Sequence, residues 1–182
     1  LMMDILRATA KVPNFFQSAS IILIETSNKL REMQKNTLKG YNVTWLKSIE
    51  DLPNIPLMVI GNEFLDALPT KQFVKINNCW QERCIKFDIN EELVYCLTNS
   101  PYNDSLNLIY SDVPNKKIVE ICDEATFIIS KLSSKISNNG GAAIFIDYGH
   151  YGELGNTFQS VKNHTFVDPL KYPGQSDLTT QV

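Results

Sequence analysis

The sequence predicts an α/β fold with a mostly parallel sheet, because short apolar runs alternate with helical patterns along the chain. Runs within residues 20–25, 57–60 and 142–146 are apolar and rich in β-branched residues, which is typical of strands buried on both faces. Polar residues follow each run directly. Ligands of open α/β sheets bind at the carboxyl ends of the strands, so these polar residues are the first candidates for a functional site.

The first quarter of the chain contains a predicted strand–helix–strand unit. Residues 1–12 have helical spacing and end at Pro13, and the strand at residues 20–25 closes with Glu25. Ser27 is suited to cap a helix that continues to Gly40, and residues 43–46 form a third short strand. A carboxylate at the position of Glu25 can accept hydrogen bonds from both ribose hydroxyls of a nucleotide, although a solvated strand-end glutamate is the alternative.

The middle of the chain predicts an antiparallel meander inserted at residues 71–98. Its strands are expected at residues 73–76, 79–87 and 93–97, with a turn at 77–78. Residues 99–111 are rich in Asn, Ser and Pro and are predicted to form a loop. A helix is predicted from Asp112 and Pro114 to residue 138, because apolar residues recur at helical spacing. Residues 150–182 are polar and are predicted to be loop-rich.

Three polar residues follow the strand at 57–60 within a short distance. Asn62, Glu63 and Asp66 lie close together, and Pro69 disfavours helix at the residue before it, so any helical turn here is short. Glu63 and Asp66 are three residues apart and can share one face of such a turn. If a ligand of this site carries a guanidinium group, carboxylates suit its planar, positively charged shape.

Two blocks of the sequence resemble a known family. The first block comprises residues 62–69 with 72–74, and the second comprises residues 145–150, 161–164, 167–169 and 173–179. In these blocks the chain is similar to the S-adenosylmethionine-dependent methyltransferases that include the mitochondrial complex I assembly arginine methyltransferase and its bacterial relatives. The similarity spans nearly the whole chain and is weakest in the middle.

The resemblance implies a fold, a cofactor and a substrate class. The fold is a Rossmann-like class I methyltransferase sheet, the cofactor is S-adenosyl-L-methionine, and the acceptor is an arginine of a protein such as a respiratory complex I subunit. The compartment is the mitochondrial matrix for a eukaryotic protein and the cytoplasm for a bacterial one.

We assign candidate site residues from their strand-end positions and from this resemblance. Glu63 is expected to be the carboxylate on the acceptor side. For His164, a hydrogen-bonded structural role is the alternative to a general base. The catalytic candidates are Glu63, Asn62 and Asp66; the cofactor-binding candidates are Glu25, Ser48, Ile49, Gly61 and Asn62; the substrate-binding candidates are Asp147, Tyr148 and His164.

The first helix lacks a preceding strand and glycine-rich loop, which the family places immediately before it. We therefore expect residues 1–182 to be a single partial methyltransferase domain whose first strand is missing and whose C-terminal part is truncated. Because that strand lies centrally in sheets of this type, the fragment alone is expected to fold poorly, to bind cofactor weakly and to be inactive.

Composition narrows the class of protein. The 182 residues are 43% hydrophobic and 20% charged with a net charge of −3, which argues against nucleic-acid binding. No apolar run is long enough to span a membrane, and no secretory signal peptide is visible. The four cysteines form no C-x-x-C pair, so we expect reduced, buried thiols and no metal site. The oligomeric state stays open.

Two other functions are compatible with parts of the pattern. A strand-end acid such as Glu25 serves NAD equally well, so an NAD-dependent oxidoreductase is one alternative. A non-catalytic interaction protein from a truncated gene is the other. Residues 62–69 argue against the first alternative, and the intact Asn62, Glu63 and Asp147 argue against the second.

Overall fold

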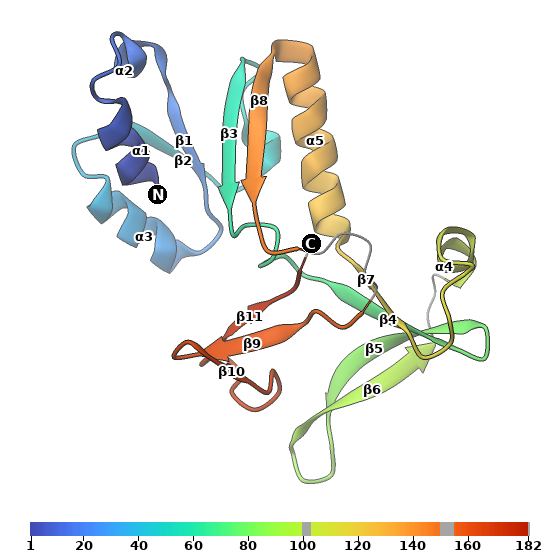
Figure 1. The fold of residues 1–182 in the computed structure, drawn as a ribbon. Helices are drawn as coiled ribbons and strands as arrows, with labels where there is room; N and C mark the ends of the chain where they lie inside the picture. Colours follow the sequence, from blue (N-terminus) through green and yellow to red (C-terminus); the bar gives the residue numbers. More distant parts are fainter. Residues whose placement is uncertain (100–102, 150–154, 182) are drawn as a thin grey trace. The chain divides into compact units, whose positions relative to one another are not determined.

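The computed structural model describes residues 1–99, 103–149 and 155–181, and the chain divides into two compact units (Figure 1). The first unit comprises Leu1–Pro56 and Lys131–Gly140. The second comprises Leu57–Ser130 and Gly141–Val182. The expectation of a single partial domain with a missing central strand stays a prediction.

The first unit contains a parallel β–α–β arrangement, as predicted. Strands β1 and β2 pair in parallel, with Ile21 opposite Val43 and helix α3 between them in sequence. The Ser27 hydroxyl oxygen accepts a hydrogen bond from the backbone N–H of Leu30 at 3.3 Å, which confirms the predicted helix cap. The elements of this unit are α1 (Met2–Thr9), α2 (Phe15–Ser18), β1 (Ile21–Ile24), α3 (Asn28–Thr37), β2 (Val43–Leu46) and a 3₁₀ turn, η1 (Ile49–Asp51).

The second unit begins with a parallel strand pair, β3 (Leu57–Asn62) and β8 (Gly141–Ile146). All six residues of each strand are in register, from Leu57 opposite Gly141 to Asn62 opposite Ile146. The two backbones approach closely at the first pair, because a Cβ atom on Gly141 would lie 2.0 Å from the Leu57 carbonyl oxygen. The register brings the carboxyl ends of both strands to one place.

The predicted meander is present and forms part of a four-stranded antiparallel sheet with the order β6-β5-β4-β7 (Figure 1). Asn77 and Asn78 connect the first two strands with φ angles of 50° and 62°, which is the pattern of a type I′ hairpin turn. The strands are β4 (Lys71–Ile76), β5 (Cys79–Phe87), β6 (Leu93–Asn99) and β7 (Ile118–Ile121).

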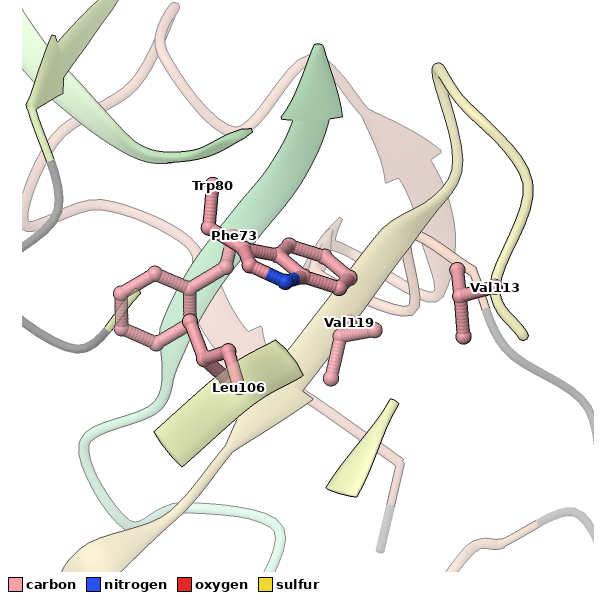
Figure 2. Close-up of a cluster of buried hydrophobic side chains, with 5 residues drawn as sticks. All are labelled: Phe73, Trp80, Leu106, Val113 and Val119. Carbon is pink, nitrogen blue, oxygen red and sulfur yellow. The ribbon is translucent and has the colours of Figure 1, made fainter. Parts of the chain in front are cut away.

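A hydrophobic cluster covers one face of this sheet. Phe73 and Trp80 are each 1% exposed and pack with Leu106, Val113 and Val119; Figure 2 shows these five side chains together. Leu106 belongs to helix α4 (Asn103–Ile109). On the same helix, the side-chain oxygen of Asn107 accepts a hydrogen bond from the Trp80 indole N–H at 3.0 Å. The cluster packs helix α4 closely against the sheet.

Two sequence-based expectations are wrong. Residues 99–111 were expected to form a loop, but α4 lies within them because Leu106 is buried in the cluster. The helix expected from Asp112 begins only at Asp123, as α5 (Asp123–Asn139), since residues 118–121 pair with β4 instead. The C-terminal part, which was expected to be rich in loops, also contains a small three-stranded antiparallel sheet of β9 (Gln159–Lys162), β10 (Thr165–Val167) and β11 (Asp177–Thr179). Residues 150–154 lie outside the described residues.

The cysteines differ from expectation in their exposure. Cys79 is exposed and Cys84, Cys96 and Cys122 are partly exposed, so none of them is a buried core residue; all four are free thiols. No helix in the described ranges is long and apolar enough to cross a membrane. Across the same ranges, no group of three or more His, Cys, Asp and Glu side chains could hold a metal ion.

Candidate active site

A turn at residues 63–66, which we call the strand-end turn, follows β3 directly. Asn62 and Glu63 are both exposed, and the backbone N–H of Glu63 donates to the Ile146 carbonyl oxygen at 2.9 Å. Glu63 has a φ of 48°, in the left-handed region that non-glycine residues adopt rarely and at a cost. The β3–β8 pair thus places an exposed carboxylate at the carboxyl ends of two parallel strands.

Asp147, the first residue after β8, holds the strand-end turn in place. Its Oδ1 atom accepts hydrogen bonds from the backbone N–H groups of Phe64, Leu65 and Asp66, at 2.7, 2.9 and 3.3 Å. Its Oδ2 atom is buried and has no hydrogen-bond partner in the part of the chain that the structure describes. The structure therefore gives Asp147 a contact within the chain, whereas its expected contact with substrate stays a prediction.

Asp66 faces inward, unlike Glu63. Its residue is only 4% exposed, and its carbonyl oxygen accepts the backbone N–H of Thr180 at 3.0 Å. Burial raises the pKa of the Asp66 carboxyl above its ordinary value of 3.8, and the negative charges of Asp147 and Glu63 add to this shift. The strand-end turn therefore presents two carboxyl groups in different environments, one solvated and one buried.

Gly61 has a packing reason for being glycine. A Cβ atom at this position would lie 2.5 Å from a ring carbon of Phe145, its partner in the β3–β8 register. The Phe145 ring also lies near the Phe64 ring, with the two centroids 6.5 Å apart. The absence of a side chain at Gly61 is thus explained by the Phe145 ring, and the expected cofactor contact of Gly61 stays a prediction.

Glu25 lies at the carboxyl end of β1 in the first unit. Its Oε1 atom accepts the backbone N–H of Ser27 at 2.9 Å, and its Oε2 atom accepts the side-chain amide of Gln34 at 3.0 Å. The Gln34 side-chain oxygen in turn accepts a hydrogen bond from the indole N–H of Trp45 at 3.0 Å. These hydrogen bonds together hold the Glu25 carboxylate in one orientation. Each carboxylate oxygen has a further lone pair, which is available to a hydroxyl donor.

Ser48 and Ile49 also belong to the first unit, just after β2. The Ser48 hydroxyl oxygen accepts the backbone N–H of Glu50 at 3.1 Å and caps the 3₁₀ turn η1. Ile49 is buried in the unit. Both residues have a structural role, and their expected contact with the cofactor is not tested by these observations.

The two remaining candidates are exposed. Tyr148 follows Asp147 and is 58% exposed. His164 lies with Asn163 in the two-residue connection between β9 and β10, where their φ angles of 61° and 49° indicate a type I′ turn. This hairpin position explains His164 without a catalytic role, and neither residue is hydrogen-bonded to the strand-end turn through any contact in the described ranges.

The comparisons with known proteins identify the family. Residues 1–182 match the model of a family of S-adenosyl-L-methionine-dependent methyltransferases. The chain belongs to this family. This chain is 33% identical over 204 residues to the mitochondrial protein arginine methyltransferase NDUFAF7 of Danio rerio, with 98% of this chain and 48% of the relative covered. It is 32% identical over 206 residues to the NDUFAF7 homolog of Caenorhabditis elegans, with 100% and 48% covered.

Solved structures agree with this assignment. A protein of Burkholderia thailandensis bound to S-adenosyl-homocysteine matches this chain with a TM-score of 0.75 at 25% identity, covering all of this chain and 48% of the other. A second structure from that organism gives a TM-score of 0.73 at 26% identity, covering 90% and 46%. The chain spans about half the length of the relatives that it matches.

The family that the chain belongs to is defined by dependence on S-adenosyl-L-methionine, and the Burkholderia structure holds S-adenosyl-homocysteine. The residues present fit this cofactor, because the fixed Glu25 carboxylate at the end of β1 in a parallel β–α–β arrangement is suited to ribose hydroxyls. The family assignment favours this cofactor over the NAD alternative.

No residue of β5 or β6 was a predicted site residue, and Gln72 of β4 entered only through the family resemblance. Asp66 lines a cavity together with Gln72, Arg83 and Tyr95, which lie on three different strands. Their alternation along each strand placed them on one face of the meander, but that pattern does not show what the face meets. Only the packing of the C-terminal strands reveals the cavity.

Proposed function

We propose that this protein transfers the methyl group of S-adenosylmethionine to an arginine side chain of a protein substrate, with Glu63 on the acceptor side. One observation carries the proposal: the exposed Glu63 carboxylate stands at the joined carboxyl ends of β3 and β8, on a turn that Asp147 holds. The relatives that are named protein arginine methyltransferases support the acceptor class.

The acceptor chemistry suits a carboxylate. S-adenosylmethionine, when bound, would supply a methyl group whose bond to sulfur breaks as the bond to the acceptor nitrogen forms; S-adenosyl-homocysteine leaves and the nitrogen releases one proton to solvent. The remaining task of the chain is to hold the acceptor nitrogen in line and to orient its lone pair. A guanidinium is planar and positively charged, so the Glu63 carboxylate can pair with two of its N–H groups and draw charge away from the attacking nitrogen.

The other residues of the strand-end turn are proposed to hold Glu63 in position. The hydrogen bonds to Asp147 fix the backbone at Phe64 and Leu65, and the left-handed conformation of Glu63 depends on this support. Asp66 is less suited to pair with a guanidinium, because it is buried and its pKa is raised by that burial. We assign Asp66 a positioning role, and Asn62 a contact with acceptor or cofactor.

The cofactor side of the proposal rests on the first unit and on the end of β3. Glu25 is proposed to accept hydrogen bonds from the ribose hydroxyls. Ser48 and Ile49 are proposed to lie against the adenine, and Gly61 to border the cofactor. We propose a respiratory complex I subunit as substrate, by analogy with the family, in the matrix of a eukaryote or the cytoplasm of a bacterium.

Calorimetric titration of the full-length protein tests the cofactor side. S-adenosylmethionine is expected to bind and NAD is not, and Glu25→Gln is expected to weaken S-adenosylmethionine binding about tenfold or more, because one ribose acceptor is lost. Glu32→Gln is the matched control, since Glu32 is an exposed glutamate of α3. Folded protein that binds neither ligand would leave a non-catalytic interaction protein.

Amino-acid analysis of the product tests the acceptor. The full-length protein is incubated with radiolabelled S-adenosylmethionine and arginine-containing proteins, and the labelled residue is identified after hydrolysis. Label is expected on arginine nitrogen. Label on another residue or on a small molecule would reject the acceptor class while keeping methyl transfer.

A further inference from the structure

A cavity of about 280 Å³ lies beside the strand-end turn, within the second unit. It is lined by residues of β4, β5 and β6, by residues of β11, and by the segment before β9. Ile85, Phe158 and Leu178 contribute apolar surface, and Asp66 borders it. This volume lies at the lower end for small-molecule pockets, so it is suited to one side chain better than to a whole cofactor.

One basic side chain stands in this cavity, and its position is fixed. Arg83 donates a hydrogen bond from Nη1 to the Gln72 side-chain oxygen at 3.0 Å. Its guanidinium carbon lies 3.5 Å from the centroid of the Tyr95 ring. The Gln72 amide nitrogen donates to Glu120 at 2.6 Å and to Asn156 at 2.7 Å. These two acceptors set the orientation of the amide, which must present its oxygen to Arg83.

Among the described residues Arg83 forms no ion pair, although it is half-buried and carries five N–H donors. Burial raises the pKa of the Tyr95 hydroxyl; the Arg83 charge opposes this shift and the Asp168 charge adds to it. A partly desolvated guanidinium that is already held in place gains more from an anionic ligand than a mobile one.

We propose that this cavity is a substrate subsite that takes an acidic side chain of the methylated protein, with its carboxylate bound by Arg83. The proposal rests on the proposed function, because the ligand is a residue of the protein substrate. Asp66 belongs both to the cavity wall and to the strand-end turn that carries Glu63. A polypeptide whose arginine reaches Glu63 therefore has a neighbouring residue available for the cavity.

The surroundings of Arg83 favour an acidic side chain over a free inorganic anion. Arg83 provides a forked, planar donor for a carboxylate, and Ile85, Phe158 and Leu178 provide apolar contact for the methylene groups behind it. Phosphate or sulfate has no such apolar part. Arg83 thus becomes a specificity residue that selects the sequence around the acceptor arginine.

Peptide selection on the full-length protein tests the subsite without relying on catalysis. Short acetylated peptides with a central arginine and randomised flanking positions are bound to the immobilised protein in the presence of S-adenosyl-homocysteine. Wild-type protein is expected to enrich Glu or Asp at one fixed position. A selected peptide with that acid replaced by Gln is expected to bind about 10- to 100-fold more weakly.

Two substitutions locate the effect at Arg83. Arg83→Gln is expected to abolish the preference at that one position and to leave S-adenosylmethionine affinity unchanged. Lys86→Gln is the matched control, because Lys86 is an exposed base on the same strand, three positions along and therefore on the opposite face. Arg83→Glu is expected to change the preference from acidic to basic residues, a gain that a misfolded variant would not show.

The outcomes separate this proposal from the proposed function. Acid-selective peptide binding without methylation of any arginine would keep the subsite and reject the acceptor class. Methylation of arginine peptides with no acidic preference, in wild type and Arg83→Gln alike, would overturn the subsite and keep the proposed function. A loss of S-adenosylmethionine affinity in Arg83→Gln would also overturn it, because the bound carboxylate would then be that of the cofactor.

Discussion

The Asp147 Oδ1 atom accepts a hydrogen bond from the backbone N–H of Phe64 at 2.7 Å, across 83 positions of the sequence. The same atom serves the next two N–H groups, so one carboxylate joins the end of β8 to the strand-end turn after β3. This contact couples the fold to the candidate active site. Removing it is expected to disturb both stability and the presentation of Glu63.

Asp147→Ala leaves three backbone N–H groups without their acceptor. We expect the free energy of unfolding to fall by about 2–4 kcal/mol and methyl transfer to fall with it. Asp147→Asn retains an acceptor oxygen but places N–H groups at the buried Oδ2 site, which has no partner among the described residues, so a loss of about 1–3 kcal/mol is expected.

Urea denaturation of the full-length protein measures these losses. Tyr148→Phe is the control, because Tyr148 is the exposed neighbour and is expected to change stability by less than about 0.5 kcal/mol. Equal stability of Asp147→Ala and wild type would show that the turn does not depend on this carboxylate.

The buried Asp66 predicts a pH dependence of stability. Burial raises the pKa of its carboxyl above 3.8, so the folded protein retains a proton that the unfolded chain releases near that pH. Its contribution to the free energy of unfolding therefore falls as the pH rises from about 3.8 through the raised pKa, and stays lower above it. Asp66→Asn removes this loss.

We expect Asp66→Asn to match wild type below about pH 3.8 and to be more stable than wild type at neutral pH. Chemical denaturation across this pH range is the measurement, with the exposed Asp51→Asn as control. Lower stability of Asp66→Asn at neutral pH would show that an ionised Asp66 stabilises the fold.

Because β3 and β8 approach closely, we expect alanine substitutions at the two neighbouring glycines, Gly140 and Gly141, to lower the free energy of unfolding by different amounts. Gly141→Ala directs a Cβ atom at the Leu57 carbonyl oxygen, 2.0 Å away, with a φ of 124°. Gly140 has a φ of 85° but open space around it. We expect Gly140→Ala to cost about 1–2 kcal/mol from backbone strain alone, and Gly141→Ala to cost more than about 3 kcal/mol.

Thermal melts of both glycine variants distinguish backbone strain, which both share, from the steric clash with Leu57, which only Gly141→Ala has. A larger loss for Gly141→Ala would confirm that the strand pair requires the missing side chain. Similar losses for the two variants would mean that the backbones separate easily at this point, and the β3–β8 register would then be less rigid than described.

Truncation of Leu106 in helix α4 is expected to lower the free energy of unfolding, although the sequence of this segment resembles a loop. Leu106 is 1% exposed among Phe73, Trp80 and Val119, so Leu106→Ala is expected to lose about 2–5 kcal/mol. The exposed Leu108→Ala, on the same helix, is expected to lose less than about 1 kcal/mol. Urea unfolding followed by Trp80 fluorescence reports both changes, and equal losses would contradict the cluster.

This helix also shows where local sequence stops being informative. Residues 103–109 have weak helical preference, and burial of Leu106 with the Trp80–Asn107 hydrogen bond decides their conformation. Residues 118–121 show the reverse case. Their apolar spacing continues that of α5 and predicts helix, yet pairing of Val119 with Phe73 makes them a strand.

Strand ends were easier to predict than contacts between them. The apolar runs correctly place Glu63 and Asp147 just after β3 and β8, because buried strands have a clear composition. The hydrogen bond from Phe64 to Asp147 depends on the register of two distant segments, which composition does not contain. The cavity that Arg83 and Asp66 both line depends likewise on how the C-terminal strands pack.

Single-turnover methyl transfer by Glu63→Gln tests the central claim most directly. The full-length variant and wild type are loaded with S-adenosylmethionine, its affinity is measured on the same samples, and transfer to an arginine substrate is followed. We predict unchanged cofactor affinity and a rate at least about 100-fold lower, because the amide cannot pair ionically with the guanidinium. A wild-type rate in Glu63→Gln would contradict the assignment of Glu63 to the acceptor.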